Sequence, residues 1–134
     1  MPADAIRIAR CRCGQLTATC RGDPVRVSVC HCRDCQRRTG GPFSAQARFP
    51  AFLVTIDGDS RVWERIADSG RRAWYHWCPD CGATVYYRNE GRGDVVAVPI
   101  GAFDGDLPRP NASIFERHRQ DWVAIVGDGI EHVD

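Results

Sequence analysis

Seven of the eight cysteines in this chain fall into three short clusters. The clusters read C-R-C-G at 11–14, C-H-C-R-D-C at 30–35 and C-P-D-C-G at 78–82. Cysteines at such spacings are joined by disulfides or by a metal ion, and either link brings distant segments of a chain together. The clusters therefore constrain the possible folds more than any other feature of the sequence.

The cellular compartment decides between disulfides and metal. The first ten residues contain no apolar stretch long enough for a signal peptide. The longest aliphatic runs, Ala51–Ile56 and Val95–Ile100, are far shorter than the ~20 residues that span a bilayer. These features predict a cytoplasmic protein without a membrane partner. Because thiols stay reduced in the cytoplasm, clustered cysteines there indicate metal more often than disulfides.

The size and charge of the chain narrow its class further. Its 134 residues fit one domain, 1–134, that is long enough to bury a hydrophobic core. The formal net charge is +1 at pH 7, and the sequence pI is about 7.6. This near-neutral balance argues against nucleic acid or an acidic membrane surface as the partner.

Turn-forming Gly, Pro and Asp residues interrupt the chain at short intervals, and the segments between them are rich in β-branched and aromatic residues. Such segments favour β-strands. Only Arg33–Thr39 has a helical pattern, of one or two turns ended by Gly40. We therefore expect a single, mostly-β domain. The expected strands are Leu16–Cys20, Val25–Val29, Phe43–Phe49, Phe52–Ile56, Arg61–Ile66, Ala73–Trp77, Thr84–Arg88, Val95–Ile100 and Trp122–Val126.

The third cluster has the spacing of a zinc knuckle. In C-x-x-C-G a tight turn brings both sulfur atoms to one side, and Gly82 permits a backbone conformation that other residues avoid. Two cysteines supply only half of a closed four-ligand site, so Cys78 and Cys81 need a partner pair. Cys11 and Cys13, also followed by a glycine, are the natural candidates. We expect these four cysteines to hold a structural zinc ion, although C-x-x-C alone is also typical of a redox pair.

The second cluster then has three cysteines, Cys30, Cys32 and Cys35, and no obvious fourth partner. This pattern is typical of a zinc site with an open coordination position, which accepts water or a substrate atom. His31 is an alternative ligand, but an extended backbone between two ligands would direct its side chain away from the metal. Cys20 is another, but its alternation with apolar residues favours a buried, small hydrophobic side chain. Pairing of the first cluster with the second is a further alternative, which would leave the third as a half-site.

Taken together, the motifs resemble the glutathione-dependent formaldehyde-activating enzyme family, which also contains centromere protein V. The resemblance rests on C-x-C-G at 11–14, on C-H-C-x-x-C at 30–35 followed by T-G-G-P-F-S at 39–44, and on C-P-x-C-G at 78–82. It extends to V-P-I-G-A-F at 98–103 and to the segment around Trp122. It therefore covers nearly the whole chain.

The resemblance implies a fold of short antiparallel β-sheets held by zinc, like that of the Mss4 family and sometimes called a β-tent. It also implies two zinc ions per chain, one structural and one catalytic. The ligands that it implies are Cys11, Cys13, Cys78 and Cys81 for the structural ion, and Cys30, Cys32 and Cys35 for the catalytic ion.

The activity implied by the resemblance is of the carbon–sulfur lyase type, the condensation of glutathione with formaldehyde to S-(hydroxymethyl)glutathione. A small-molecule thiol such as glutathione is thus the expected partner. Zinc coordination lowers the pKa of a thiol, which gives a nucleophilic thiolate near neutral pH. The alternative is a zinc-stabilised protein-binding module without catalysis, which would expose an apolar patch.

Glutathione carries two carboxylates, so a site that binds it needs cationic groups. Arg33, Arg37 and Arg38 surround the second cluster in sequence, and Arg33 and Arg37 share one face of the expected helix. Each is equally well explained as a solvated surface residue. The other candidates, more simply explained as core or surface residues, are Phe43, Trp74 and Trp77 for the pocket walls and His76 and His118 for proton transfer.

Overall fold

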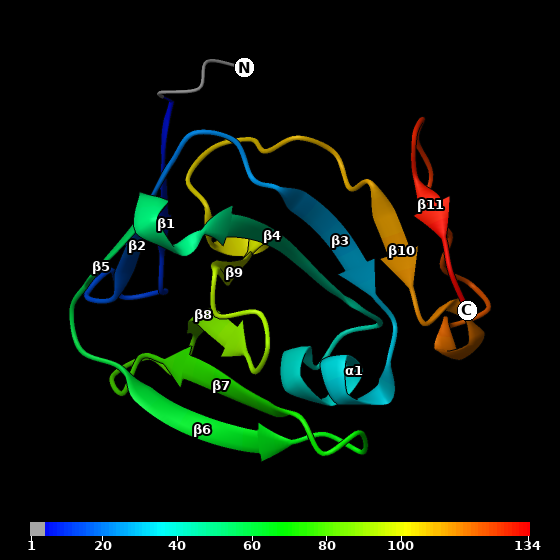
Figure 1. Cartoon of the computed structure of the whole chain (residues 1–134), viewed down its shortest axis with the longest axis horizontal. Coiled ribbons are helices and arrows are strands. Elements are labelled where there is room, and N and C mark those ends of the chain that lie inside the picture. Colours follow the sequence, from blue (N-terminus) through cyan, green and yellow to red (C-terminus); the bar gives the residue numbers. More distant parts are fainter. Residues whose placement is uncertain (1–4) are drawn as a thin grey trace.

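The computed structural model describes residues 5–134 as two β-sheets and one short α-helix (Figure 1). The smaller sheet has three antiparallel strands, in the order β1 (Ile6–Arg10), β2 (Thr17–Arg21) and β5 (Val54–Asp57). β1 and β2 pair along their whole length, from Ile6 opposite Arg21 to Arg10 opposite Thr17. The first cysteine cluster therefore lies in the turn between these two strands.

The larger sheet has eight strands and mixed directions. Across the sheet they are β11 (Glu131–His132), β10 (Ala112–Ile114), β3 (Arg26–Cys30), β4 (Ser44–Pro50), β9 (Val95–Pro99), β8 (Thr84–Asn89), β7 (Arg72–Trp77) and β6 (Arg61–Ile66). β10 runs parallel to both β3 and β11, and every other neighbouring pair is antiparallel. The sheet bends strongly between β4 and β7 (Figure 1).

Helix α1 (Arg33–Thr39) lies between the two halves of the bent sheet (Figure 1). It begins where the Cys32 side chain accepts a hydrogen bond from the backbone N–H of Cys35 at 3.4 Å. It ends at Gly40, whose φ of 70° suits a residue without a Cβ atom. Within residues 5–134 no helix combines the length and hydrophobicity needed to cross a membrane. Three 3₁₀ helices complete the fold: η1 (Ala51–Leu53), η2 (Ile100–Ala102) and η3 (Glu116–His118).

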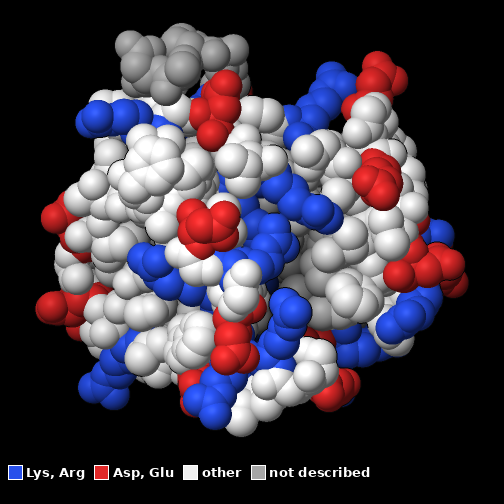
Figure 2. All heavy atoms as spheres, in the orientation of Figure 1, with Lys and Arg blue, Asp and Glu red and all other residues white. Residues whose placement is uncertain are grey.

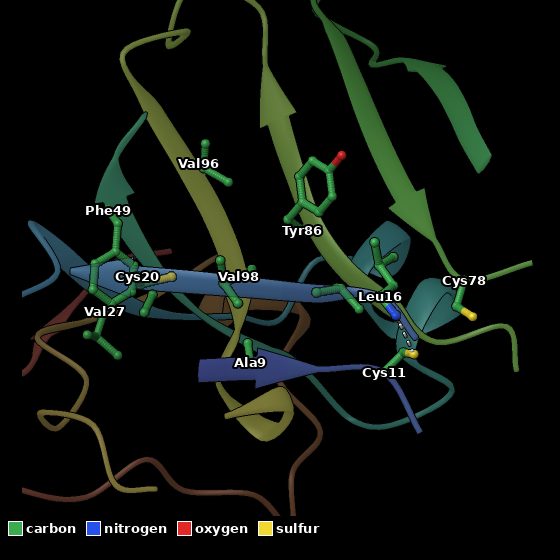
Figure 3. Packing of buried hydrophobic residues seen from close by; sticks show 13 residues of the cluster. Ala9, Cys11, Leu16, Cys20, Val27, Phe49, Cys78, Tyr86, Val96 and Val98 are labelled. Carbon is green, nitrogen blue, oxygen red and sulfur yellow. Dashed lines mark hydrogen bonds between the residues drawn. The ribbon is translucent and has the colours of Figure 1, made fainter. Parts of the chain in front are cut away.

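The main hydrophobic core lies between the two sheets. Figure 3 shows it extending from Phe49 and Val27 at one end to Cys11 and Cys78 at the other. Cys20 is fully buried within it, which confirms the expectation of a small hydrophobic side chain there. Cys11 and Cys78 belong both to this core and to the cysteine clusters. The packing of the core and the geometry of the clusters therefore depend on each other. The other core residues are Ala9, Leu16, Ala18, Ala47, Val85, Tyr86, Val96 and Val98.

The helix and eight of the nine expected strands are confirmed, with ends shifted by one or two residues in most cases. In the expected strand Phe52–Ile56, the first residues belong instead to η1 (Ala51–Leu53), and the strand begins only at Val54. The prediction of a strand over Trp122–Val126 is wrong, because this segment forms no strand and its residues Trp122 and Val126 are largely exposed. Apolar residues favour a strand only where a neighbouring strand and a core receive them.

Three strands are absent from the sequence-based prediction. β10 and β11 have three and two residues, too few for an alternating pattern to be recognised. β1 reverses the usual pattern, because Ile6 and Ile8 are exposed whereas Arg7 and Ala9 are buried. The side chain of Arg7 is accommodated by an ion pair with Asp23 at 3.1 Å.

Two phenylalanines provide a matched test of the core. Phe49 is 0% exposed and Phe52, in η1, is 85% exposed. We expect Phe49→Ala to lower the free energy of unfolding by about 3–4 kcal/mol, because a large buried side chain is replaced by a cavity. Phe52→Ala should change it by no more than about 0.5 kcal/mol. Urea denaturation followed by tryptophan fluorescence measures both, and equal losses would contradict the position of the core.

Candidate metal centres and active-site cleft

Four cysteines from two distant turns meet at one end of the core. Cys11 and Cys13 lie in the turn after β1, and Cys78 and Cys81 lie in the turn after β7. Their four sulfur atoms lie within 4.8 Å of one another. The sulfur of Cys13 is 3.7 Å from that of Cys11 and 3.7 Å from that of Cys78. We call these residues the four-cysteine group.

The sulfur spacing fits a tetrahedral zinc ion. With zinc–sulfur bonds of about 2.3 Å, neighbouring sulfur atoms of a tetrahedral site are about 3.8 Å apart. The measured separations of 3.7 Å agree with this geometry. Four thiolates are also the donor set that structural zinc sites use. The group is therefore suited to hold zinc without any movement of the backbone.

Nearby N–H groups donate hydrogen bonds to sulfur atoms of this group, and the thiolate is favoured at Cys78 and Cys81. The backbone N–H of Leu16 donates to Cys11 Sγ at 3.3 Å, and Gln15 Nε2 donates to Cys78 Sγ at 3.1 Å. Burial raises the pKa of Cys78, but the hydrogen bond from Gln15 and two backbone hydrogen bonds outweigh it and lower the pKa. Backbone hydrogen bonds at Ala83 and Cys13 lower the pKa of Cys81 to about 6. A thiolate, not a thiol, is the form that binds metal.

Gln15 also fixes the turn between β5 and β6 against the four-cysteine group. Its amide donates to the carbonyl of Asp59 at 2.7 Å and accepts from the Asp59 N–H at 3.0 Å. The neighbouring Gly58 has a φ of 98°, and a Cβ atom there would lie 1.9 Å from the Gln15 carbonyl oxygen. Only glycine permits this close approach. The turn can therefore pack directly against the segment that carries the cysteines.

The other three clustered cysteines lie together at the start of α1. Cys30 ends β3, Cys32 caps the helix and Cys35 lies in its first turn. Their sulfur atoms lie within 4.8 Å of one another, and no fourth Cys, His, Asp or Glu of the described residues joins them. We call these residues the three-cysteine group. The two groups are separate, so the alternative pairing of the first cluster with the second is wrong.

Hydrogen bonding within the three-cysteine group favours the thiolate at Cys35. Hydrogen bonds with Cys30 and Cys32 lower the pKa of Cys35 to about 2. Hydrogen bonds with Cys32 and then with Cys35 raise the pKa of Cys30 well above its usual value. A bound cation would favour the thiolate at all three sulfur atoms, and their spacing fits a zinc ion that keeps one coordination position for another ligand.

His31 is fully buried, at 0% exposure, but its side chain points away from the sulfur atoms. Its Nε2 lies 2.9 Å from Ser113 Oγ on β10, and its ring packs edge-on against Phe43. Ser113 Oγ in turn donates to Glu116 at 2.7 Å. Burial lowers the pKa of His31, so the neutral ring is favoured. His31 therefore attaches the cysteine turn to β10 rather than serving as a ligand.

The three-cysteine group opens into a cleft of about 710 Å³. Two carboxylates line this cleft, and the hollow on the face in Figure 2 is surrounded by arginine side chains. Asp34 is one of the two, and it is paired with Arg65 at 2.9 Å. The positive charge of the cleft is therefore in excess, which favours an anionic ligand. The arginines that line it are Arg33, Arg37, Arg48, Arg65 and Arg117.

The cleft only partly matches the substrate contacts expected from the sequence. Arg33, Arg37 and His118 line it, as expected for docking or proton transfer. His76 does not; it stacks on Tyr86 at 4.2 Å inside the adjoining sheet. Trp77 instead lines a neighbouring cleft of about 370 Å³. The remaining two aromatic candidates, Phe43 and Trp74, line neither cleft.

Several cleft residues are missing from the sequence-based prediction. They lie on strands or loops far from the cysteines in sequence, so spacing alone gives no signal for them. Tyr75 and Tyr87 form a cross-strand pair whose rings lie 4.9 Å apart. The others include Gln46, Arg48, Arg65, Arg117 and Phe115.

The fold and the two cysteine groups define a small β-domain equipped for metal binding. A family model described as "Glutathione-dependent formaldehyde-activating enzyme" matches residues 6–118, and the chain belongs to this family. The resemblance drawn from the cysteine motifs, and the mostly-β, Mss4-like fold class, are therefore confirmed.

The comparison with solved structures gives the same fold. A crystal structure of a Rhodobacter sphaeroides protein is similar, with a TM-score of 0.56 and 15% sequence identity. The similarity covers 75% of this chain and 91% of that chain. A comparison with curated protein sequences finds no significant match.

Elemental analysis of purified protein tests the two cysteine groups. We expect about two zinc ions per wild-type chain and about one in Cys32→Ser, which should stay folded. Cys81→Ser should lose its stability, because the four-cysteine group joins distant turns and structural zinc binding contributes on the order of 10 kcal/mol in small zinc domains. Thermal unfolding measures that loss. Equal, mild zinc loss from both variants would contradict the distinction between the groups.

Proposed function

We propose that the protein is a zinc-dependent enzyme that forms or breaks the carbon–sulfur bond of a thiol adduct, as in the condensation of glutathione with formaldehyde. One observation carries the proposal: three cysteines, joined by no fourth ligand from residues 5–134, face a cleft lined by five arginines. Three cysteines leave a coordination position for a ligand from solution, and the arginines favour a ligand that is an anion. Glutathione is both a thiol and an anion.

Cys30, Cys32 and Cys35 would hold the zinc ion of this site. When bound, zinc supplies a lowered thiol pKa and polarisation of a carbonyl oxygen. The cysteines bring it to the wall of the cleft, because Cys30 and Cys35 are buried and the more accessible Cys32 caps the helix. Cys11, Cys13, Cys78 and Cys81 would hold the second, structural ion. Two ions thus serve two different purposes in one small chain.

The reaction balances without an oxidant or another co-reactant. The thiol sulfur donates an electron pair to the carbonyl carbon, a carbon–sulfur bond forms, and the proton released from sulfur ends on the former carbonyl oxygen. The reverse direction breaks the same bond and returns the thiol and the aldehyde. His118, which lines the cleft, is positioned to carry that proton in either direction.

The arginines explain how the cleft would hold a peptide-sized thiol. Arg65 is neutralised by Asp34, whereas Arg48 and Arg33 have no carboxylate partner within the described residues. Arg48 donates to Ser28 Oγ at 3.3 Å and lies over the Tyr87 ring at 6.0 Å, so its guanidinium is held in place beside the cleft. A fixed guanidinium suits bidentate binding of a carboxylate.

Cobalt substitution tests whether the three-cysteine group accepts a thiol. Added glutathione should shift the thiolate–cobalt charge-transfer bands of the substituted protein, because a fourth sulfur joins the metal. In Cys32→Ser the shift should be lost, whereas the bands of the four-cysteine group should remain. An unchanged wild-type spectrum with glutathione and with small thiols would overturn the proposal.

Arg48→Met tests the docking of the thiol's carboxylates. We expect it to weaken glutathione binding about tenfold, as expected for one lost charge-assisted ion pair. Binding of 2-mercaptoethanol, a thiol without a carboxylate, should be unchanged. Arg72→Met removes an exposed arginine outside the cleft and serves as the control. Titrations followed by the cobalt spectrum measure the affinities of both variants for glutathione and 2-mercaptoethanol. Equal effects of Arg48→Met and Arg72→Met on glutathione binding would contradict the role of Arg48 in docking.

A protein-binding module without catalysis is the second candidate. Its support is an apolar surface around Phe52, which is 85% exposed and adjoins the half-exposed Val25 in a shallow cleft. This surface is separate from the three-cysteine group, because the two clefts share no lining residue. A cobalt spectrum that responds to no thiol would favour this candidate over the enzyme.

A further inference from the structure

We propose that Arg38 is a built-in counter-charge for the three-cysteine group, which favours the binding of a fourth, negatively charged sulfur there. The inference rests on the proposed function, since it assigns a residue that tunes the same site. Arg38 lines the neighbouring cleft of about 370 Å³ and not the cleft into which the three-cysteine group opens. It would therefore act through the cysteines, as a positioning residue and not a catalytic one.

The helix places Arg38 on the same face as Cys35. Cys35 and Arg38 are three residues apart in α1, so their side chains share one helix face. The Arg38 guanidinium carbon lies 5.1 Å from the centre of the Tyr75 ring and 5.0 Å from the centre of the Tyr87 ring. These rings pair across β7 and β8 and form a floor beneath the helix. The guanidinium is therefore held between the helix and the sheet.

The charge of Arg38 has no carboxylate partner among the described residues. The nearest acidic residue on the helix, Asp34, is paired with Arg65. The Nε atom of Arg38 is buried and has no hydrogen-bond partner in the part of the chain that the structure describes. A buried cation needs compensation, which aromatic faces supply only in part. The sulfur atoms of the three-cysteine group, as thiolates on a metal ion, would supply the remaining negative charge.

Arg38 and Cys35 also interact directly, because the Cys35 side chain lies among the groups around the guanidinium, together with Tyr87 and Tyr75. A guanidinium stays charged at any physiological pH, so its positive charge is a fixed feature of the three-cysteine group's surroundings.

The consequence for a bound metal follows from counting charges. A divalent ion with three thiolates carries one net negative charge, and a fourth thiolate makes it two. The doubly negative state is the harder one to place beside a protein interior. A fixed, partly buried cation interacts more strongly with such a charge than an exposed arginine, whose field is screened by water and salt. Arg38 therefore stabilises the thiolate-bound state more than the state without it.

Ligands of different charge separate this role from a merely structural one. The probes are 2-mercaptoethanol, which binds as an anion and has no carboxylate, and imidazole, which binds metal as a neutral ligand. In the cobalt-substituted protein, Arg38→Met should weaken 2-mercaptoethanol binding about tenfold and leave imidazole binding unchanged. Arg38→Lys should restore most of the loss. Spectral titration gives these affinities without any assay of activity.

The neighbouring Arg37 provides the matched control. It is exposed and lines the cleft, so its charge reaches the substrate's carboxylates rather than the sulfur atoms. Arg37→Met should weaken binding of glutathione but not of 2-mercaptoethanol. Arg38→Gln, which keeps hydrogen-bonding capacity without the charge, replaces Arg38→Met if the methionine variant fails to fold, and the same tenfold loss is expected.

The possible failures are distinguishable. If the wild-type protein binds imidazole but no thiol, the proposed function is overturned. If the wild type binds thiols and the uncharged Arg38 variant binds them equally well, only the role of Arg38 is overturned. The same holds if imidazole binding falls as much as thiol binding, because Arg38 then supports the local structure and not the charge.

Discussion

The four sulfur atoms of Cys11, Cys13, Cys78 and Cys81 hold the start of the chain against its middle, and much of the architecture depends on that contact. The turn after β1 and the turn after β7 belong to different sheets, so their meeting fixes how the sheets face each other. The same contact closes one end of the core, where Cys11 and Cys78 are buried (Figure 3). Gln15 extends it to the β5–β6 turn through paired hydrogen bonds. Strands of this length have little stability alone, so a link between sheets is needed.

The three-cysteine group depends on a different device, a seven-residue helix that would not be stable in isolation. Contacts on both sides keep α1 in place: Asp34 pairs with Arg65 on β6, and Gln36 donates to the carbonyls of His31 and His118 at 2.7 Å and 3.1 Å. Cys35 and Arg38 lie on one face of the helix, with Cys35 at the cleft and the Arg38 guanidinium against the Tyr75 and Tyr87 rings. One short element thus brings a cysteine of the three-cysteine group and a partly buried positive charge close together.

Much of this arrangement can be predicted from the sequence, and the reason lies in local spacing. The helix was predictable because Gly40 ends it, and the two cysteine groups because close spacing leaves few ways to complete four ligands. The positions of Arg48, Tyr75 and Tyr87 could not be predicted, because these residues reach the cleft only through strand pairing over long sequence distances. For Trp122–Val126 a strand was predicted that does not form, because the composition favours a strand but no neighbouring strand pairs with this segment.

The parallel pairing of β10 with β3 has a consequence for the time at which the cleft can form. It joins residues 28–30 to residues 112–114, and the cleft-lining Phe115, Arg117 and His118 follow directly after β10. Contacts between segments so far apart are slow to form, because a long loop must close before they are made. During synthesis both cysteine groups can assemble once the chain has passed residue 81, but one wall of the cleft is still missing. A growing chain can therefore bring its two cysteine groups together well before its cleft is complete.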